Sequence, residues 1–354
     1  MRQANIEILR ALLMFFVVGC HVLNLGANAY PPLLTSGVNY YFTAFFDSFF
    51  MLAVDCFVII SGFFGIKLKV KKTVSLVLPV YFYSFLFGGL GSLLGYGSFS
   101  SSNLFPILNN SYWFLTSYLL LCLFSPILNS FVENSSKSFF LKVLCVFYVL
   151  FSIIPSFSFF SLTHDDGFGI INFILLYLTG RFIAQVKSHL LQSWQMWFVF
   201  NLLAVFIIFS ENVLVNLIIG YNKGYQGLFW HYDNIFIIWG SIALFITFLN
   251  VKIENLIISK AICWLSPSFF YIYIIHCTHP LGSLFFKFVD ESWFLNTDIF
   301  PLYVVSLTLS IFIICLITDV VLRRVVFRKL LAIIETLILK SYSRIEYILV
   351  NKNR

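Results

Sequence analysis

The stretch NIEILRALLMFFVVGCHV, residues 5–22, decides the fold class of this chain. It is apolar throughout, and as an α-helix rising about 1.5 Å per residue it would cross most of a hydrocarbon layer about 30 Å thick. It also carries Arg10 near its start and His21 near its end. The stretch therefore predicts a membrane helix that keeps one permanently charged side chain and one titratable side chain.

The rest of the chain has the same apolar character. Of its 354 residues, 60% are hydrophobic and only 10% are charged, whereas a soluble domain carries about 25% charged residues. The apolar runs are long and unbroken, unlike the short alternating strands of a transmembrane β-barrel. We therefore predict an all-α, polytopic membrane protein.

About ten transmembrane helices are expected. The runs of spanning length cover residues 6–25, 44–66, 74–95, 112–131, 139–157, 168–186, 194–213, 231–250, 261–285 and 302–322. If the N-terminus is cytoplasmic, almost all of the 22 Lys and Arg residues fall in cytoplasmic segments. The positive-inside rule then predicts that both termini are cytoplasmic.

Two domains of unequal size are predicted. No linker or internal repeat divides residues 1–325, which we interpret as one transmembrane domain. Residues 326–354 are basic and carry apolar side chains at helical spacing, which predicts an amphipathic cytoplasmic tail helix on the inner leaflet. VVGC at 17–20 loosely resembles a lipoprotein cleavage site, but Glu7 and Arg10 so close to the apolar run favour a retained first helix.

The distribution of charge and of cysteines indicates which ligands and partners are not expected. The net charge is +7, but the basic residues lie in short loops and in the tail, which indicates topology signals and no nucleic-acid partner. The seven cysteines lie mostly in apolar segments without a CxxC pair, so free thiols are expected. His164-Asp165-Asp166 and His231-Tyr232-Asp233 match no metal motif and are interpreted as solvated loops. No metal site is predicted.

Arg10 and His21 share one face of the first helix. They are eleven positions apart, which is only about 20° beyond three full turns and roughly 16 Å along the axis. Each intramembrane Arg costs about 2.5–3.5 kcal/mol on insertion scales, so a hydrated position inside the bundle is expected. The alternative is that Arg10 reaches the headgroups and pairs with Glu7.

Asp55 lies in the middle of the second span. An isolated carboxylate there would be protonated or paired, and Arg10 and His21 are candidate partners. Ser61, followed by Gly62, permits close helix approach or a break in the helix.

Two further residues are candidates for a site. Trp113 opens the fourth span, where a membrane aromatic belt is the alternative interpretation. His276 is deep in the ninth span, where a hydrogen-bonded structural histidine is the alternative.

Four stretches together resemble the bacterial acyltransferase-3 family. They are NIEILRALLMFFVVGCHV, AVDCFVIISGFF, YWFLTSYLLLCLFSPILN and YIYIIHCTHP, and the resemblance runs from about residue 4 to residue 325. Family members are integral membrane O- or N-acyltransferases with about ten transmembrane helices that act on cell-surface glycans and related acceptors. The resemblance implies an O-acetyltransferase of a surface polysaccharide or lipid-linked glycan, in the bacterial inner (plasma) membrane.

The resemblance also assigns roles. It implies that His21 is the catalytic base, that Arg10 binds the acyl donor or shapes the site, and that Asp55 is the family's second-span acid. The family's RxxR-like pattern after the second span is replaced here by KKTVSLVLP. The basic residues of that region, which could act as point charges instead of an arginine clamp, are Lys69, Lys71 and Lys72.

The implied donor is cytoplasmic acyl-CoA, most often acetyl-CoA, used as a co-substrate. Ser61, Trp113 and His276 complete the expected binding residues, with a glycan acceptor and membrane lipid as partners and homo-oligomers left open. Neutral His21 would take the proton of a sugar hydroxyl, with Asp55 orienting the imidazole, or would itself carry the acyl group; the sequence leaves both open. The alternative function is a glycan or lipid-linked sugar transporter or flippase, although no inverted repeat supports it.

Overall fold

The described residues form helices joined by turns and irregular loops. The computed structural model describes residues 3–26, 37–108, 112–158, 162–190, 193–219, 230–287 and 294–351, and no strand occurs among them. The helices are α1 (Ala4–His21), α2 (Val38–Phe50), α3 (Leu52–Phe64), α4 (Val70–Leu93), α5 (Ser101–Leu104), α6 (Trp113–Asn134), α7 (Lys137–Tyr148), α8 (Ile154–Phe157), α9 (Ile170–Leu190), α10 (Trp194–Ile219), α11 (Ile235–Asn250), α12 (Leu256–Leu265), α13 (Phe269–Cys277), α14 (Leu284–Lys287), α16 (Phe300–Val321) and α17 (Arg328–Asn351). The predicted all-α class is confirmed.

The predicted spans correspond to these helices. Within the described ranges, nine segments are long and apolar enough to cross a membrane, and α11 is apolar but has only 16 residues. α11 begins later than predicted because Asn234 caps it, accepting a hydrogen bond from the backbone N–H of Phe236. The protein is therefore an integral multi-pass membrane protein. The cytoplasmic position of the termini stays a prediction.

The ninth span differs from its predicted extent of 261–285. It consists of α12 and α13, separated by a short turn that contains Pro267. α13 ends at Cys277, and Pro280 follows shortly afterwards, as is common after a helix C-terminus because proline cannot continue a helix. This early end puts His276 and Cys277 in the last turn of a helix that packs against α1.

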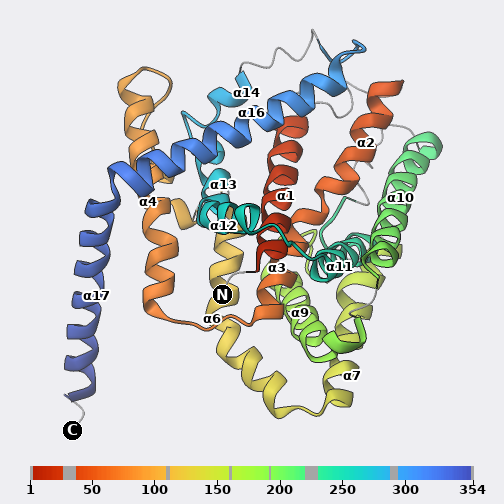
Figure 1. Ribbon diagram of the computed structural model, residues 1–354, viewed down its shortest axis with the longest axis horizontal. Coiled ribbons are helices and arrows are strands. Elements are labelled where there is room, and N and C mark those ends of the chain that lie inside the picture. Colours follow the sequence, from red (N-terminus) through yellow and green to blue (C-terminus); the bar gives the residue numbers. More distant parts are fainter. Residues whose placement is uncertain are drawn as a thin grey trace.

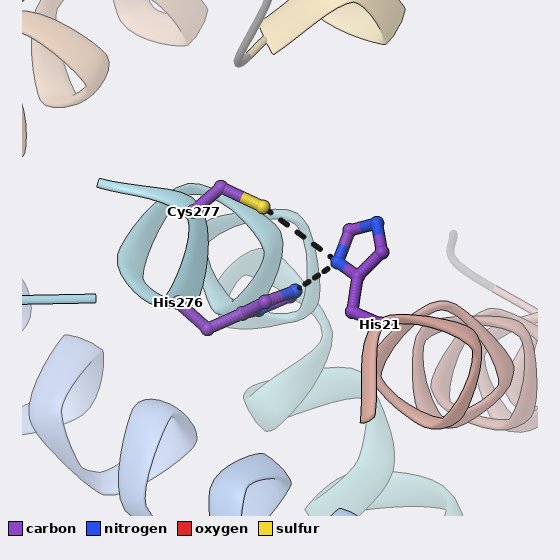
Figure 2. Close-up of side chains that lie close together, drawn as sticks. All are labelled: His21, His276 and Cys277. Atoms are coloured by element: carbon purple, nitrogen blue, oxygen red, sulfur yellow. Dashed lines mark hydrogen bonds between the residues drawn. The ribbon is translucent and has the colours of Figure 1, made fainter. Parts of the chain in front are cut away.

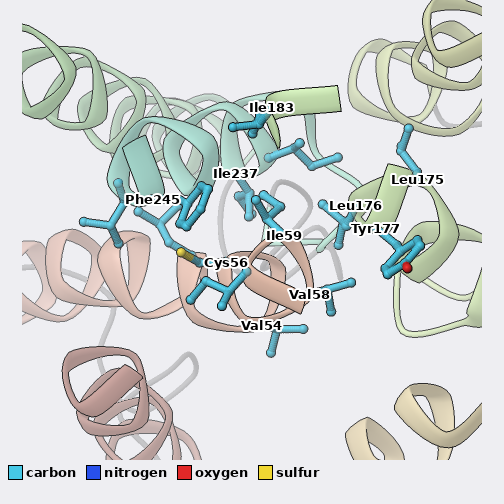
Figure 3. Close-up of a cluster of buried hydrophobic side chains, with 14 of the residues drawn as sticks. Val54, Cys56, Val58, Ile59, Leu175, Leu176, Tyr177, Ile183, Ile237 and Phe245 are labelled. Atoms are coloured by element: carbon cyan, nitrogen blue, oxygen red, sulfur yellow. The ribbon is translucent and has the colours of Figure 1, made fainter. Parts of the chain in front are cut away.

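One side of the bundle is solidly packed. α3 contacts α9 and α11 through buried aliphatic and aromatic side chains, including Ile59, Leu176 and Phe245 (Figure 3). A Cβ atom at Gly62 would overlap the carbonyl oxygen of Tyr177, so only glycine allows this approach of the two backbones. The close helix approach expected at Ser61-Gly62 is therefore present, and α3 continues through it without a break.

α1 lies in the middle of the molecule, where it packs against α3, α13 and α16 (Figure 1). α17 stands at the edge beside α4 (Figure 1), and the Ser75 hydroxyl of α4 donates a hydrogen bond to the Glu335 carboxylate at 2.6 Å. The tail is thus one long helix, whereas its placement on the inner leaflet stays a prediction. Residues 352–354 of the predicted tail lie outside the described residues.

Candidate active site

A cavity of about 860 Å³ lies along α1, between this helix and α3, α4, α6 and α13. Its volume is within the range of about 300–1,000 Å³ that is typical of small-molecule sites. Arg10 and His21 both line it, as their shared helix face predicts. Of the other predicted site residues, the cavity is lined by Ser61, Lys69, Lys71, Lys72 and Trp113, whereas Asp55 and His276 are not among its lining residues.

The Arg10 guanidinium is held by its own helix. Its Nη1 lies 2.6 Å from Oε1 of Glu7, one turn earlier, and the Glu7 side chain is only 2% exposed. The pairing that the sequence offered as an alternative is therefore present, but both residues also line the cavity. Pairing and a role in the site are compatible, because an arginine keeps several donor N–H groups after one is used.

Three exposed lysines that lie close together in the chain also line the cavity. Lys69 precedes the first residue of α4, and Lys71 and Lys72 lie in its first turn. Among the described residues none of the three forms an ion pair. They form a patch of positive charge that is available to an anionic ligand.

Arg323 is a basic lining residue that the sequence analysis missed. Its Nε and Nη2 donate to the two carboxylate oxygens of Asp319 at 2.7 and 2.6 Å, and its guanidinium lies 4.2 Å from the centre of the Tyr271 ring. From the sequence, Arg323 was interpreted only as one of the basic residues that set the membrane topology. The i,i+4 spacing from Asp319, at the end of an apolar helix, could have indicated this pair.

His21 is paired with a second histidine that lies 255 positions away in the chain. Nδ1 of His21 is 2.8 Å from Nε2 of His276, and Nδ1 of His276 is 2.6 Å from the backbone carbonyl of Ile272 (Figure 2). A carbonyl only accepts, so Nδ1 of His276 carries the proton and its Nε2 is the acceptor. His21 therefore donates from Nδ1. Its Nε2, on the far side of the ring in Figure 2, keeps a free lone pair.

Asp55 does not orient His21 in this structure. Its side chain is fully buried, and neither carboxylate oxygen has a hydrogen-bond partner. Its electrostatic neighbours include Asp233, in the connection before α11. Burial, with the charges of Asp166 and Asp165 nearby, raises the pKa of Asp233 to about 6. The expected pairing of Asp55 with Arg10 or His21 is thus corrected: Arg10 pairs with Glu7, and His21 with His276.

Aromatic side chains form part of the cavity lining. Trp113 packs against Phe168 and Tyr232, with ring centroids 4.5 and 5.5 Å apart, and it lines the cavity as part of an aromatic wall. Tyr273 also lines the cavity, with its ring centroid 6.4 Å from that of His21.

Ser61 also lines the cavity, where its hydroxyl donates to the carbonyl of Phe57 at 3.0 Å. Such a back-bond within a helix satisfies the hydroxyl locally.

The comparison with protein families agrees with this arrangement. A family model described as an acyltransferase domain, Acyl_transf_3, matches residues 3–320. The chain belongs to the acyltransferase-3 family. No curated protein and no solved structure matches it.

As a member of the acyltransferase-3 family, the chain is a membrane acyltransferase. The matched segment runs from just before α1 to the last turn of α16 and so includes every residue predicted for the site. The tail helix α17 lies beyond it.

Proposed function

We propose that the protein transfers an acyl group, most often acetyl, from cytoplasmic acyl-CoA to a hydroxyl of a cell-surface polysaccharide or lipid-linked glycan, in a bacterial inner membrane. The observation that carries this proposal is the single cavity lined both by the three lysines and by His21. The alternative of a transporter or flippase gains nothing from the family match, which is to an acyltransferase domain.

The basic part of the cavity suits the donor. Acyl-CoA carries several phosphates, which the exposed ammonium groups of Lys69, Lys71 and Lys72 would attract as point charges. Arg10 also lines the cavity, on the same helix face as His21, and would meet the part of the donor that enters the bundle. The thioester would then reach the histidine part.

The histidine part suits the chemistry. Nε2 of His21 would accept the proton of the acceptor hydroxyl as its oxygen attacks the thioester carbon. The proton would then pass to the leaving thiolate of CoA. His276 would hold the imidazole in the productive tautomer through Nδ1 and stabilise the imidazolium that forms. The same lone pair could instead attack the thioester and form an acyl-His intermediate.

The experiment compares wild type with His21→Ala in proteoliposomes that receive radiolabelled acetyl-CoA and surface glycan from the host cell. We expect His21→Ala to lower transfer by about 10²–10⁴-fold, the contribution of a general base. The matched control is His279→Ala, which changes an exposed histidine just beyond α13 that does not line the cavity. Wild-type transfer by His21→Ala would refute the assignment.

A further inference from the structure

Three side chains that bind metals converge where α13 meets α1. Nδ1 of His21 lies 2.8 Å from Nε2 of His276 and 3.7 Å from Sγ of Cys277 (Figure 2). The three ligand atoms all lie within 4.8 Å of one another. In the part of the chain that the structure describes, this is the one group of three or more His, Cys, Asp or Glu side chains close enough to share a metal ion.

His276 is already held as a metal-binding histidine would be. Its Nδ1 donates to the backbone carbonyl of Ile272 at 2.6 Å, which leaves Nε2 unprotonated and aimed at His21. Histidines that bind metals usually donate their other ring N–H to a carbonyl or carboxylate in this way, which fixes the tautomer and the ring orientation.

The donor set selects a class of metal. Two imidazole nitrogens and one thiolate suit Zn²⁺, whereas Mg²⁺ and Ca²⁺ prefer oxygen ligands. Tetrahedral zinc, with bonds of about 2.0 Å to nitrogen and 2.3 Å to sulfur, needs about 3.3 Å between its two nitrogens and about 3.6 Å from nitrogen to sulfur. The two His21 contacts are within about 0.5 Å of these separations. His21 also lines the cavity, from which water would have to supply the fourth ligand.

We propose that Zn²⁺ binds to Nδ1 of His21, Nε2 of His276 and Sγ of Cys277, and that it thereby blocks acyl transfer. On binding, the Cys277 thiol loses its proton to solvent and becomes a thiolate. The metal takes the place of the proton on Nδ1 of His21, and the neutral imidazole then carries its one proton on Nε2. One proton is released in total. The base has lost its lone pair, so the blocking step rests on the proposed function of His21.

No metal site was predicted from the sequence. Metal motifs are recognised by ligands that lie close together in the chain, whereas His21 and Cys277 are 256 positions apart. The site exists only because α13 ends next to α1.

Binding is tested first without any measurement of activity. The purified full chain in detergent is treated with a maleimide with and without Zn²⁺, and alkylation of each cysteine is followed by mass spectrometry. We expect Zn²⁺ to slow alkylation of Cys277 at least about tenfold, because the bound thiolate is unavailable. Cys145, which is exposed and outside the cluster, is the internal control. Equal alkylation of Cys277 with and without Zn²⁺ would overturn the site and leave the proposed function standing.

Transfer is then measured against free Zn²⁺. We expect wild type to be inhibited and to recover when a chelator is added. Cys277→Ser should keep its basal transfer and need at least about tenfold more Zn²⁺ for the same inhibition, since the thiolate is one of three protein ligands. Cys145→Ser should respond as wild type does. Inhibition that is the same in Cys277→Ser and wild type would overturn the proposal.

One combination of results would keep the zinc site and overturn the proposed role of His21. If Zn²⁺ protects Cys277 from alkylation but does not lower transfer, the blocking mechanism is wrong, and so is the assignment of His21 as the base.

Discussion

The two ends of the cavity present different kinds of polar group. At the basic end, Lys69, Lys71 and Lys72 are exposed and carry net positive charge. At the histidine end, His21 donates to His276, and the Tyr273 ring lies 6.4 Å from the His21 ring. The proposed function assigns a different task to each end: the lysines would bind the anionic donor, and His21 would accept the proton of the acceptor.

The largest effect in this comparison is expected at the histidine end, from His276→Phe. This change removes the acceptor that fixes the tautomer of His21. We expect kcat to fall by roughly 10²-fold while KM for acetyl-CoA stays nearly constant, because the loss concerns the chemical step. Steady-state transfer with radiolabelled acetyl-CoA measures both constants.

The matched variant is His276→Gln, whose side-chain oxygen can accept the same hydrogen bond. We expect it to recover at least about tenfold of the lost kcat. If His276→Phe and His276→Gln were equally impaired, His276 would fill space and would not position His21.

A smaller effect is expected at the basic end. Changing Lys69, Lys71 and Lys72 together to Gln should raise KM for acetyl-CoA about tenfold with kcat unchanged. The lysines would bind the donor equally well in the ground state and in the transition state, so their loss weakens binding without slowing the chemical step. The wild-type KM should also rise with salt, since exposed charges are screened over about 10 Å at 0.1 M. In the variant this salt dependence should be weaker.

The control for the basic end is the pair Lys137→Gln and Lys142→Gln, two lysines of α7 that do not line the cavity. They should leave KM and its salt dependence as in wild type. A triple lysine variant with lowered kcat and unchanged KM would show that the basic end does not bind the donor.

The smallest effect is expected from Asp55→Asn, which keeps the shape of the side chain and removes its charge. Asp55 has no hydrogen bond to His21. Residues that share no interaction partner usually change each other's energy by less than about 0.5 kcal/mol. Loss of the Asp55 charge should therefore change kcat by less than about threefold. A loss as large as that of His276→Phe would restore Asp55 as the residue that orients His21.

The fold was largely predictable because the lipid bilayer requires every spanning segment to be a helix with an apolar surface. Each span of about 20 apolar residues is visible in the sequence without knowledge of its neighbours. The errors lie at two helix boundaries set by local chemistry: Asn234 caps the start of α11, and Pro280 follows the end of α13. Both signals were present in the sequence, but they move a boundary without adding or removing a helix.

Helical geometry predicted the relative position of two site residues only where both lie on one helix. Arg10 and His21 lie on one helix, so their common face followed from helical geometry. The contact of His21 with His276 joins residues 255 positions apart, and no periodicity in the sequence relates α1 to α13. For the same reason the sequence made Asp55 a plausible partner of His21, whereas in the packed bundle its side chain is fully buried and does not line the cavity.

The most direct test of the account is the position of a bound non-hydrolysable acetyl-CoA analogue, determined by electron cryomicroscopy of the protein in a lipid nanodisc. The account predicts that the phosphates lie at Lys69, Lys71 and Lys72 and that the acetyl group lies beside Nε2 of His21. An analogue whose acetyl group lies at the basic end, or outside this cavity, would contradict it.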